Sequence, residues 1–523
     1  MKGSSVIFIA VRDYDNLGIG YMEAILSTTV FDTKIIDFKN NKNTILRIIK
    51  RENPFLVGFS VIFQYYIDKF IDLIRFLREE GIESHFTAGG HYASLKYQEL
   101  FDFIPELDSI VRGEGEYILR DLANSLYKGS DWRKLKGLVY KKDGELIANP
   151  PRPFEKDLDR IPFPKRGPLK KYAFTKKFAT LIAGRGCIYN CTFCNEGKFY
   201  TSLSGPVKRI RKPEMVVREM DYLYHKRKCR VFIFFDDDFP IRTVNKYEWV
   251  LKFCDQLDFR KLSGRIMWRV SCRPDEVDEE IFSKMKKTGL FQVFLGIEDG
   301  TDRGLKNLNK HMTLDESIQG INILKKLKIG IDFGFMLFQP STTFSSLNEN
   351  ISFLKVLSED GYTPVTFLKL MPYYKTAVEQ QLKKEGRLKI SKGIRDYDFL
   401  DDKMDHYYDF ITLCFMEWLR YSGGLENISH WARNYFAVFQ FYSGTDSYFS
   451  SLKRKFKKAI SESNLFLLDT MSELSVLFES GKYKTETDLL EDYREKITSM
   501  HDYFKKLIYY YIDLLLMHGQ VYL

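Results

Sequence analysis

The chain contains 523 residues, of which 44% are hydrophobic and 29% are charged. This composition has enough apolar side chains to build buried cores, so it excludes an intrinsically disordered protein. Lysine and arginine number 80 against 70 aspartates and glutamates, which leaves a mild net charge of +10. At roughly 100–200 residues per domain, the length predicts about three domains.

Neither end of the chain predicts membrane insertion. The first residues are predicted to form a strand, not the apolar region of a signal peptide, and the apolar run 507–517 falls short of the roughly 20 residues that span a bilayer. The densest basic run, 453–458, is predicted to be a solvated helix face and not a nucleic-acid patch. We expect a cytoplasmic protein whose seven cysteines are reduced thiols or metal ligands.

Residues 4–127 alternate short apolar strands with amphipathic helices. The predicted strands are 5–11, 33–38, 54–63, 84–87 and 109–112. Near-continuous apolar strands separated by helices are typical of a doubly wound parallel sheet, and therefore predict an α/β, Rossmann-like domain. Ligands of such sheets bind beyond the carboxyl ends of the strands.

A second series of βα units begins near residue 178. Its six predicted strands are 178–183, 230–235, 265–271, 291–297, 331–338 and 365–370. Six units in sequence predict a partial (β/α)6 barrel, similar to a TIM barrel, with its working face at the carboxyl ends of the strands. From about residue 386 the pattern becomes mainly helical.

Four segments follow from this pattern. We expect a Rossmann-like domain at 1–130, a Pro-rich linker at 131–177 with a small hairpin at Asp143-Gly144, a partial barrel at 178–385 and a helical C-terminal domain at 386–523.

Three cysteines lie on one short loop after the first predicted barrel strand. They are Cys187, Cys191 and Cys194. Thiolates are preferred ligands of iron–sulfur clusters, and three ligands instead of four leave one iron open for a further molecule. A structural zinc site is the alternative, but zinc usually takes four protein ligands, and this loop contains no other Cys or His.

This C-x-x-x-C-x-x-C run, with Phe193 before the last cysteine, resembles the radical SAM superfamily. The resemblance implies that the cysteines bind a 4Fe-4S cluster and that S-adenosylmethionine (SAM) chelates its open iron. An electron from the cluster then splits SAM into methionine and a 5′-deoxyadenosyl radical. We expect an external donor such as flavodoxin or ferredoxin to supply that electron.

Other barrel residues lie in runs similar to SAM-binding motifs of this family. Asp236 and Asp237 follow the second barrel strand in a run that resembles DD-x-F, and Glu298 follows the fourth in a run that resembles G-I-E-x-G. Ser271 and Arg273, at the end of the third strand, are further candidates. The resemblance implies that these five side chains contact SAM. For each aspartate, a solvated loop or helix cap is the alternative.

Glycines follow several predicted strands of the first domain, where glycine lets the backbone approach a bulky ligand closely. Together they resemble the cobalamin-binding domain that precedes many radical SAM barrels. The resemblance implies cobalamin contacts from Ser60, Gly89, Gly90, His91, Gly113, Glu114 and Gly115. A Rossmann-like domain that has lost its ligand is the alternative.

One position departs from the usual cobalamin motif. Many such domains carry D-x-H-x-x-G, whose histidine ligates cobalt from below, whereas this chain has Asp15 at the histidine position. A carboxylate is a poor substitute for imidazole on cobalt. Radical SAM proteins with cobalamin domains commonly lack this histidine, so the departure favours that subgroup. We predict that no protein nitrogen binds cobalt on its lower face.

The resemblance covers residues 1–385 and implies an enzyme that uses cobalamin, SAM and a 4Fe-4S cluster. Its commonest activity is methyl transfer from SAM, via methylcobalamin, to an unactivated carbon of a small-molecule or peptide substrate. A radical rearrangement or cyclisation without methyl transfer remains open. A non-catalytic cobalamin sensor is the third hypothesis, and the intact cysteine run argues against it. Methyl transfer is favoured over rearrangement by analogy alone.

Overall fold

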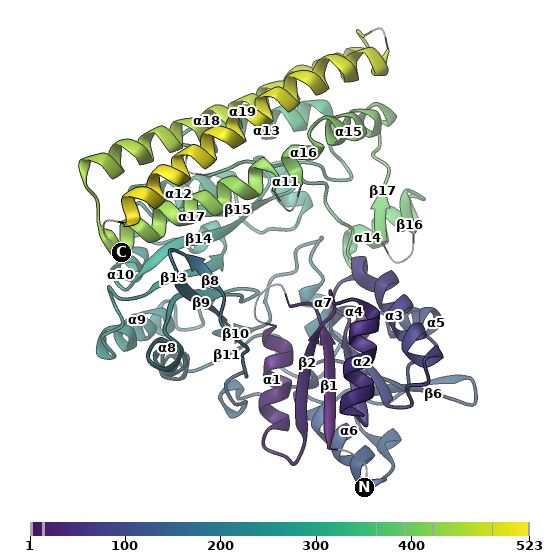
Figure 1. Cartoon of the computed structure of the whole chain (residues 1–523). Helices are drawn as coiled ribbons and strands as arrows, with labels where there is room; N and C mark the ends of the chain where they lie inside the picture. The colour runs from purple at the N-terminus through teal and green to yellow at the C-terminus, as the bar shows by residue number, and fades with distance from the viewer. Residues whose placement is uncertain are drawn as a thin grey trace.

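The computed structural model describes residues 4–12, 16–361, 363–391, 394–420, 423–483 and 485–520. Its first sheet has seven strands in the order β2-β1-β3-β4-β5-β6-β7, and it lies at the lower end of the molecule in Figure 1. The strands are β1 (Ser5–Ala10), β2 (Asp32–Asp37), β3 (Leu56–Ser60), β4 (His85–Gly89), β5 (Ser109–Val111), β6 (Leu138–Lys142) and β7 (Glu145–Ala148).

The first five strands are parallel and carry helices on both faces. Alternate side chains of β1 explain this arrangement, because Ile7 packs toward α2 and α3 whereas Phe8 packs toward α1 and α6. The predicted doubly wound α/β sheet is therefore confirmed. Its helices are α1 (Leu17–Leu26), α2 (Lys42–Glu52), α3 (Ile67–Glu79), α4 (His91–Leu95), α5 (Tyr97–Phe103) and α6 (Gly115–Lys128).

The hairpin at Asp143-Gly144 belongs to this first sheet. Its strands β6 and β7 add to β5 in antiparallel register. We therefore propose that the first domain extends to about residue 148 and that the linker begins there. The predicted boundary at residue 130 places the hairpin in the linker, because the sequence pattern does not show which sheet the hairpin joins.

The second sheet is a half-barrel with the strand order β15-β14-β13-β12-β9-β8. Five of its strands are parallel, and β8 pairs antiparallel with β9 at one edge. The strands are β8 (Lys171–Ala173), β9 (Lys176–Leu181), β12 (Cys229–Phe234), β13 (Met267–Cys272), β14 (Leu290–Glu298) and β15 (Gly330–Phe335). The sixth predicted strand, 365–370, is reduced to one parallel bridge between Phe338 and Lys369. Prolines at 364 and 372 flank it, and proline donates no ladder hydrogen bond.

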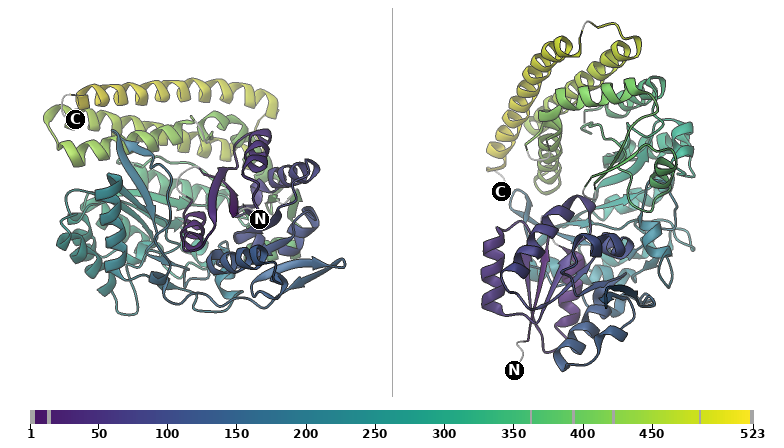
Figure 2. Two further views of the ribbon diagram at one scale, coloured as in Figure 1. Left: turned by 60° about the horizontal axis from the view of Figure 1, so that its bottom comes forward. Right: turned by 90° about the vertical axis from the view of Figure 1, so that its right-hand side faces the viewer.

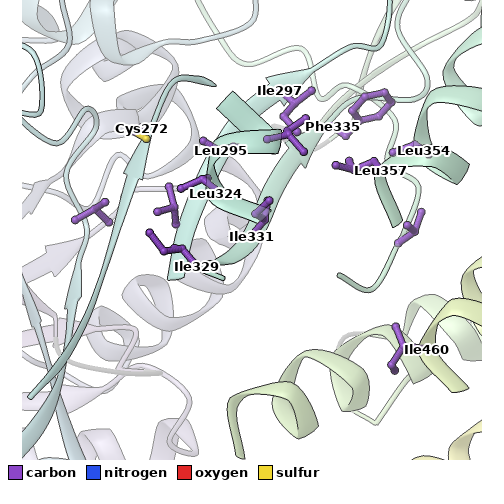
Figure 3. Close-up of a cluster of buried hydrophobic side chains, with 14 of the residues drawn as sticks. Cys272, Leu295, Ile297, Leu324, Ile329, Ile331, Phe335, Leu354, Leu357 and Ile460 are labelled. Carbon is purple, nitrogen blue, oxygen red and sulfur yellow. The ribbon is translucent and has the colours of Figure 1, made fainter. Parts of the chain in front are cut away.

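Helices cover the outer face of the half-barrel. Figure 3 shows Leu295 and Ile331 of the strands beside Leu324 and Leu354 of the covering helices, in one apolar layer. These helices are α8 (Pro213–Arg227), α9 (Glu248–Phe259), α10 (Glu279–Lys287), α12 (Leu314–Lys326) and α13 (Phe344–Ser358).

The inner face of the half-barrel receives α17 from the C-terminal domain. Val438 of α17 packs against Phe178, Ile233 and Met267 of three different strands. Two long helices, α18 and α19, form the outer side of this domain (Figure 2). The domain also holds a small hairpin, β16–β17. Its elements, with the helix that precedes them, are α14 (Ala377–Lys384), β16 (Leu388–Ser391), β17 (Ile394–Tyr397), α15 (Asp402–Cys414), α16 (Met416–Leu419), α17 (Leu425–Ser443), α18 (Ser447–Ser480) and α19 (Glu486–Gln520).

Among the described residues, no helix combines the length and apolar character that crossing a membrane requires.

Candidate functional site

The three cysteines lie on a segment that we call the cluster loop, residues 186–195. It begins just after β10 (Gly184–Arg185), runs into α7 (Glu196–Thr201) and returns through β11 (Arg209–Ile210). Gly186 has a φ of +84°, and a Cβ there would lie 1.8 Å from the carbonyl oxygen of Val207. Only glycine fits this crossing of two backbones, which explains why glycine precedes the first cysteine.

Two aspartates hold the start of the cluster loop. Asp236 accepts hydrogen bonds from the backbone N–H groups of Ala183 at 2.9 Å and Gly184 at 2.6 Å. Asp237 accepts one from the N–H of Gly186 at 2.9 Å. Because its carboxylate is buried and bonded to backbone, we propose that Asp236 positions the loop instead of contacting SAM. Asp237 remains a candidate contact.

The middle of the cluster loop is held by residues that follow the run containing Glu298. Asn309 donates to Asn190 at 2.8 Å, and the N–H of Thr192 donates to the carbonyl of Leu308 at 3.0 Å. The guanidinium of Arg273 lies 4.0 Å from the ring centre of Tyr189. Since Arg273 is also ion-paired with its neighbour Asp275 at 2.8 Å, we propose that it orients the loop.

The donor set fits an iron–sulfur cluster better than a single metal ion. A structural zinc ion usually takes four protein ligands, whereas the cluster loop supplies three thiols and no histidine. Burial raises the pKa of the Cys187 and Cys194 thiols to about 12. Such thiols become ligands when a strongly cationic centre displaces their protons, and iron supplies that charge.

Glu298 lies at a bulge in β14, where its φ is +70°. Its carboxylate bends back over Gly296 and Gly334, and a Cβ at Gly296 would lie 2.9 Å from its Oε1. Lys310 is buried, and its Nζ lies 3.5 Å from Oε1 of Glu298. The sequence analysis assigned no role to Lys310. This buried pair offers one anionic and one cationic group to a zwitterionic ligand such as SAM.

A cavity of about 840 Å³ lies between the carboxyl edge of the first sheet and the cluster loop. It brings together the predicted residues Ser60, Gly89, Gly90, His91, Gly113, Glu114, Gly115, Asp237 and Cys194. Asp236, Ser271, Arg273 and Glu298 are not among its described lining residues. Ser271 lies on the inner face of β13, one strand away from Glu298.

The walls of this cavity suit a large ring system. Aromatic and aliphatic side chains predominate, including Phe59, Tyr66, Phe193 and Tyr373. Glycines supply the edge where the strands end, so that backbone groups can meet a ligand directly. The predicted run at 13–15, with Asp15, lies outside the described residues.

Buried ion pairs join the two sides of the cavity. Glu114 lies 2.6 Å from Arg209 and 3.2 Å from Arg185, and Arg185 also pairs with Glu116 at 2.6 Å. Burial alone would raise the pKa of Glu114, but the two arginines lower it. We therefore propose that the carboxylate of Glu114 bonds to the barrel segment instead of contacting cobalamin. Sequence reasoning missed both arginines, although Arg185 lies two residues before Cys187.

His91 makes a second connection across the cavity. Its Nε2 lies 3.0 Å from Glu196 of α7, and its ring packs on Phe199 at 4.1 Å between centres. Like Glu114, it is predicted as a cobalamin contact but bonds to the segment that carries the cluster loop.

Comparison with known proteins agrees with this geometry. A model of the radical SAM superfamily matches residues 181–354, and a model of the B12 binding domain matches residues 4–123. An uncharacterised methyltransferase of Pyrococcus horikoshii is 28% identical over 66% of this chain and 74% of its own length. The anaerobic magnesium-protoporphyrin IX monomethyl ester cyclase of Rubrivivax gelatinosus is 28% identical over 66% of this chain, which spans only 63% of that protein.

A solved structure shares the fold. The cobalamin-dependent SAM radical enzyme OxsB, with aqua-cobalamin and S-adenosylmethionine bound, has a TM-score of 0.65 at 18% identity, covering 95% of this chain and 84% of that one.

Fold and site together define a radical SAM enzyme, whose cofactors are a 4Fe-4S cluster and SAM. The B12 binding domain in front of the half-barrel adds cobalamin as the third. The chain belongs to the cobalamin-dependent radical SAM enzymes.

Proposed function

We propose that this enzyme transfers a methyl group from SAM to an unactivated carbon of a small-molecule or peptide substrate. The observation that carries the proposal is the single cavity shared by the glycine edge of the first sheet and the cluster loop. A methyl carrier on one wall and a radical source on the other would then face one substrate. The name of the Pyrococcus horikoshii relative supports the same activity.

Each set of residues has a distinct part in this proposal. Cys187, Cys191 and Cys194 hold the cluster, while Glu298 and Lys310 bind the charged end of SAM. When bound, the cluster supplies the electron that cleaves SAM, and cobalamin supplies the carrier for the methyl group.

The cavity also needs to exclude water from a radical reaction. Tyr373 and Tyr374 line it, and the hydroxyl of Tyr374 donates to the carbonyl of Ile62 at 3.3 Å. Arg395 of β17 pairs with Glu379 at 2.6 Å and with Glu99 of the first domain at 3.2 Å. These bonds hold the segment that follows the barrel against the first domain, so that it covers the cavity.

The test uses SAM with a deuterated methyl group. The full chain, reconstituted under anaerobic conditions with iron, sulfide, hydroxocobalamin and a reductant, is incubated with a low-molecular-mass extract and with a peptide pool. We expect mass spectrometry to find a product that carries the deuterated methyl group and is absent with the Cys191→Ala variant. Release of 5′-deoxyadenosine together with a new product that lacks the label would overturn methyl transfer.

That second outcome would favour a rearrangement or cyclisation, for which the name of the Rubrivivax gelatinosus relative is the supporting observation. A flavodoxin or ferredoxin is proposed as the electron donor in either case.

A further inference from the structure

One part of the inner face of the half-barrel, on β13, β14 and β15, carries polar side chains. Side chains alternate along β13, so that Trp268 and Val270 enter the outer core while Arg269 and Ser271 face inward. Figure 3 shows the apolar outer layer beside β14 and β15. Gln292 and Asp332 face inward from these two strands, where Gln292 donates to Asp332 at 3.0 Å.

Helix α17 packs against this inner face of the half-barrel. Its Arg433 donates to Oδ1 of Asp332 at 2.6 Å, and Nδ1 of His430 lies 3.1 Å from the same oxygen. The other oxygen of Asp332 accepts the hydrogen bond from Gln292. Both oxygens of Asp332 are therefore already in contact with protein donors, two at Oδ1 and one at Oδ2.

Arg269 differs from its neighbours because its donors remain available. Its Nη1 lies 3.8 Å from Asp332, beyond hydrogen-bond distance, and its Nε is buried without an acceptor. Arg269 donates no hydrogen bond in the part of the chain that the structure describes. About a fifth of its side chain remains exposed, at 21%, so a ligand can reach it.

The charges around Arg269 leave a positive excess. Arg269 and Arg433 both face Asp332, while His430 is matched by Glu426 at 3.2 Å. Although burial opposes it, Asp332 raises the pKa of His430, which favours its charged form. Three cationic groups thus face two carboxylates, which suits one additional negative charge.

We propose that Arg269 anchors an oxyanion of the substrate, a carboxylate or a phosphoryl group, inside the half-barrel. An arginine offers a planar fork of N–H donors that matches two oxygens of such a group. Ser271 lies two residues further along the same face, about 7 Å toward the carboxyl edge at the usual rise of a strand. The body of an anchored substrate would therefore extend toward Ser271 and Glu298, where SAM is proposed to bind.

This assignment rests on the proposed function only in that the anchored molecule is the substrate. The carboxylate of SAM is not the ligand we assign, because the resemblance places that group on the cluster iron, at the opposite end of the strands. The assignment gives the C-terminal domain a role in binding, because the bound anion would lie against α17.

The experiment measures binding without turnover. The full chain, loaded with cluster, hydroxocobalamin and SAM, is mixed with methylphosphonate or with acetate, and saturation-transfer NMR follows the methyl protons of each probe. The variants are Arg269→Gln, which removes the charge, and Arg269→Lys, which keeps it but loses the fork. Arg265→Gln is the matched control, because Arg265 is exposed just before the same strand.

We expect at least one probe to bind the unaltered protein and the control, and to bind Arg269→Gln about tenfold more weakly, the loss typical of a hydrogen bond to a charged group. Binding of methylphosphonate alone identifies a phosphoryl group, and binding of acetate alone a carboxylate. If Arg269→Gln does not fold, a weaker affinity of Arg269→Lys carries the same conclusion.

Absence of binding by both probes, or equal binding by all variants, would overturn the assignment. Neither result depends on methyl transfer, so a failure of the labelled-methyl experiment is distinguishable from a failure here.

Discussion

The two walls of the central cavity are built in different ways. On the barrel side, directional bonds fix the cluster loop at its start, through Asp236 and Asp237, and at Asn190, through Asn309. On the side of the first domain, glycine backbone and apolar rings form the wall. Two polar residues of that wall, His91 and Glu114, bond across to the barrel segment. We therefore expect the first domain to bind cobalamin mainly through shape complementarity. The barrel side is expected to bind the iron of the cluster through side chains that are held in fixed positions.

This comparison predicts that the two cofactors can be lost separately. Replacing Cys187, Cys191 and Cys194 by alanine should abolish iron–sulfur absorbance and all release of 5′-deoxyadenosine, because the cluster has no other described ligands. Binding of hydroxocobalamin, measured by absorbance titration, should persist in this variant. Any 5′-deoxyadenosine formed by it would contradict the cluster assignment.

Breaking an ion pair between the two walls should have the next largest effect, a loss of stability. Glu114→Gln leaves Arg209 buried without a carboxylate, and breaking a buried pair typically costs about 3–5 kcal/mol of stability. Chemical unfolding of the loaded protein should show this loss. The matched control is Glu80→Gln, which removes an exposed pair with Lys50 and should cost about 0–1 kcal/mol. Equal losses in both variants would mean that the buried pairs do not hold the walls together.

The shape of the first wall depends on Gly90. Its φ is +110°, and a Cβ there would lie 2.8 Å from the carbonyl oxygen of Val61 at the edge of the cavity. Gly90→Ala should cost about 1–3 kcal/mol through backbone strain and should weaken cobalamin binding without lowering the iron content. Gly81→Ala is the control, because Gly81 has a φ of +77° but open space around it. Unchanged affinity for hydroxocobalamin in Gly90→Ala would contradict the glycine cradle.

A substitution of Glu298 tests the proposed SAM site in the half-barrel. Glu298→Gln keeps the size of the side chain but removes the charge beside Lys310, so SAM should bind about tenfold more weakly if a charge-assisted bond is lost. Equilibrium dialysis with labelled SAM measures this change, and the iron content should remain normal. A dissociation constant equal to that of the unaltered protein would remove Glu298 from the SAM site.

The barrel wall was the easier one to predict from sequence, for a physical reason. A cluster needs thiolates at close spacing on one loop, so its ligands form a local pattern around Cys191. The partners of Glu114, Arg185 and Arg209, are 71 and 95 residues away in the chain, and a local sequence pattern cannot predict contacts at such separations. The same holds for α17, because nothing in its own sequence showed that Arg433 would pair with Asp332 inside the half-barrel.

The smallest expected effect concerns His91, the described histidine that lines the cavity. Its Nε2 is bonded to Glu196 and its ring packs on Phe199, so we expect it not to ligate cobalt. Because Asp15 replaces the usual histidine, cobalamin should bind with its own base displaced and no protein nitrogen below. Electron paramagnetic resonance of the cobalt(II) form should then show no nitrogen superhyperfine splitting, and His91→Gln should leave that spectrum unchanged. Splitting that disappears in His91→Gln would make His91 the ligand, and splitting that persists would indicate dimethylbenzimidazole.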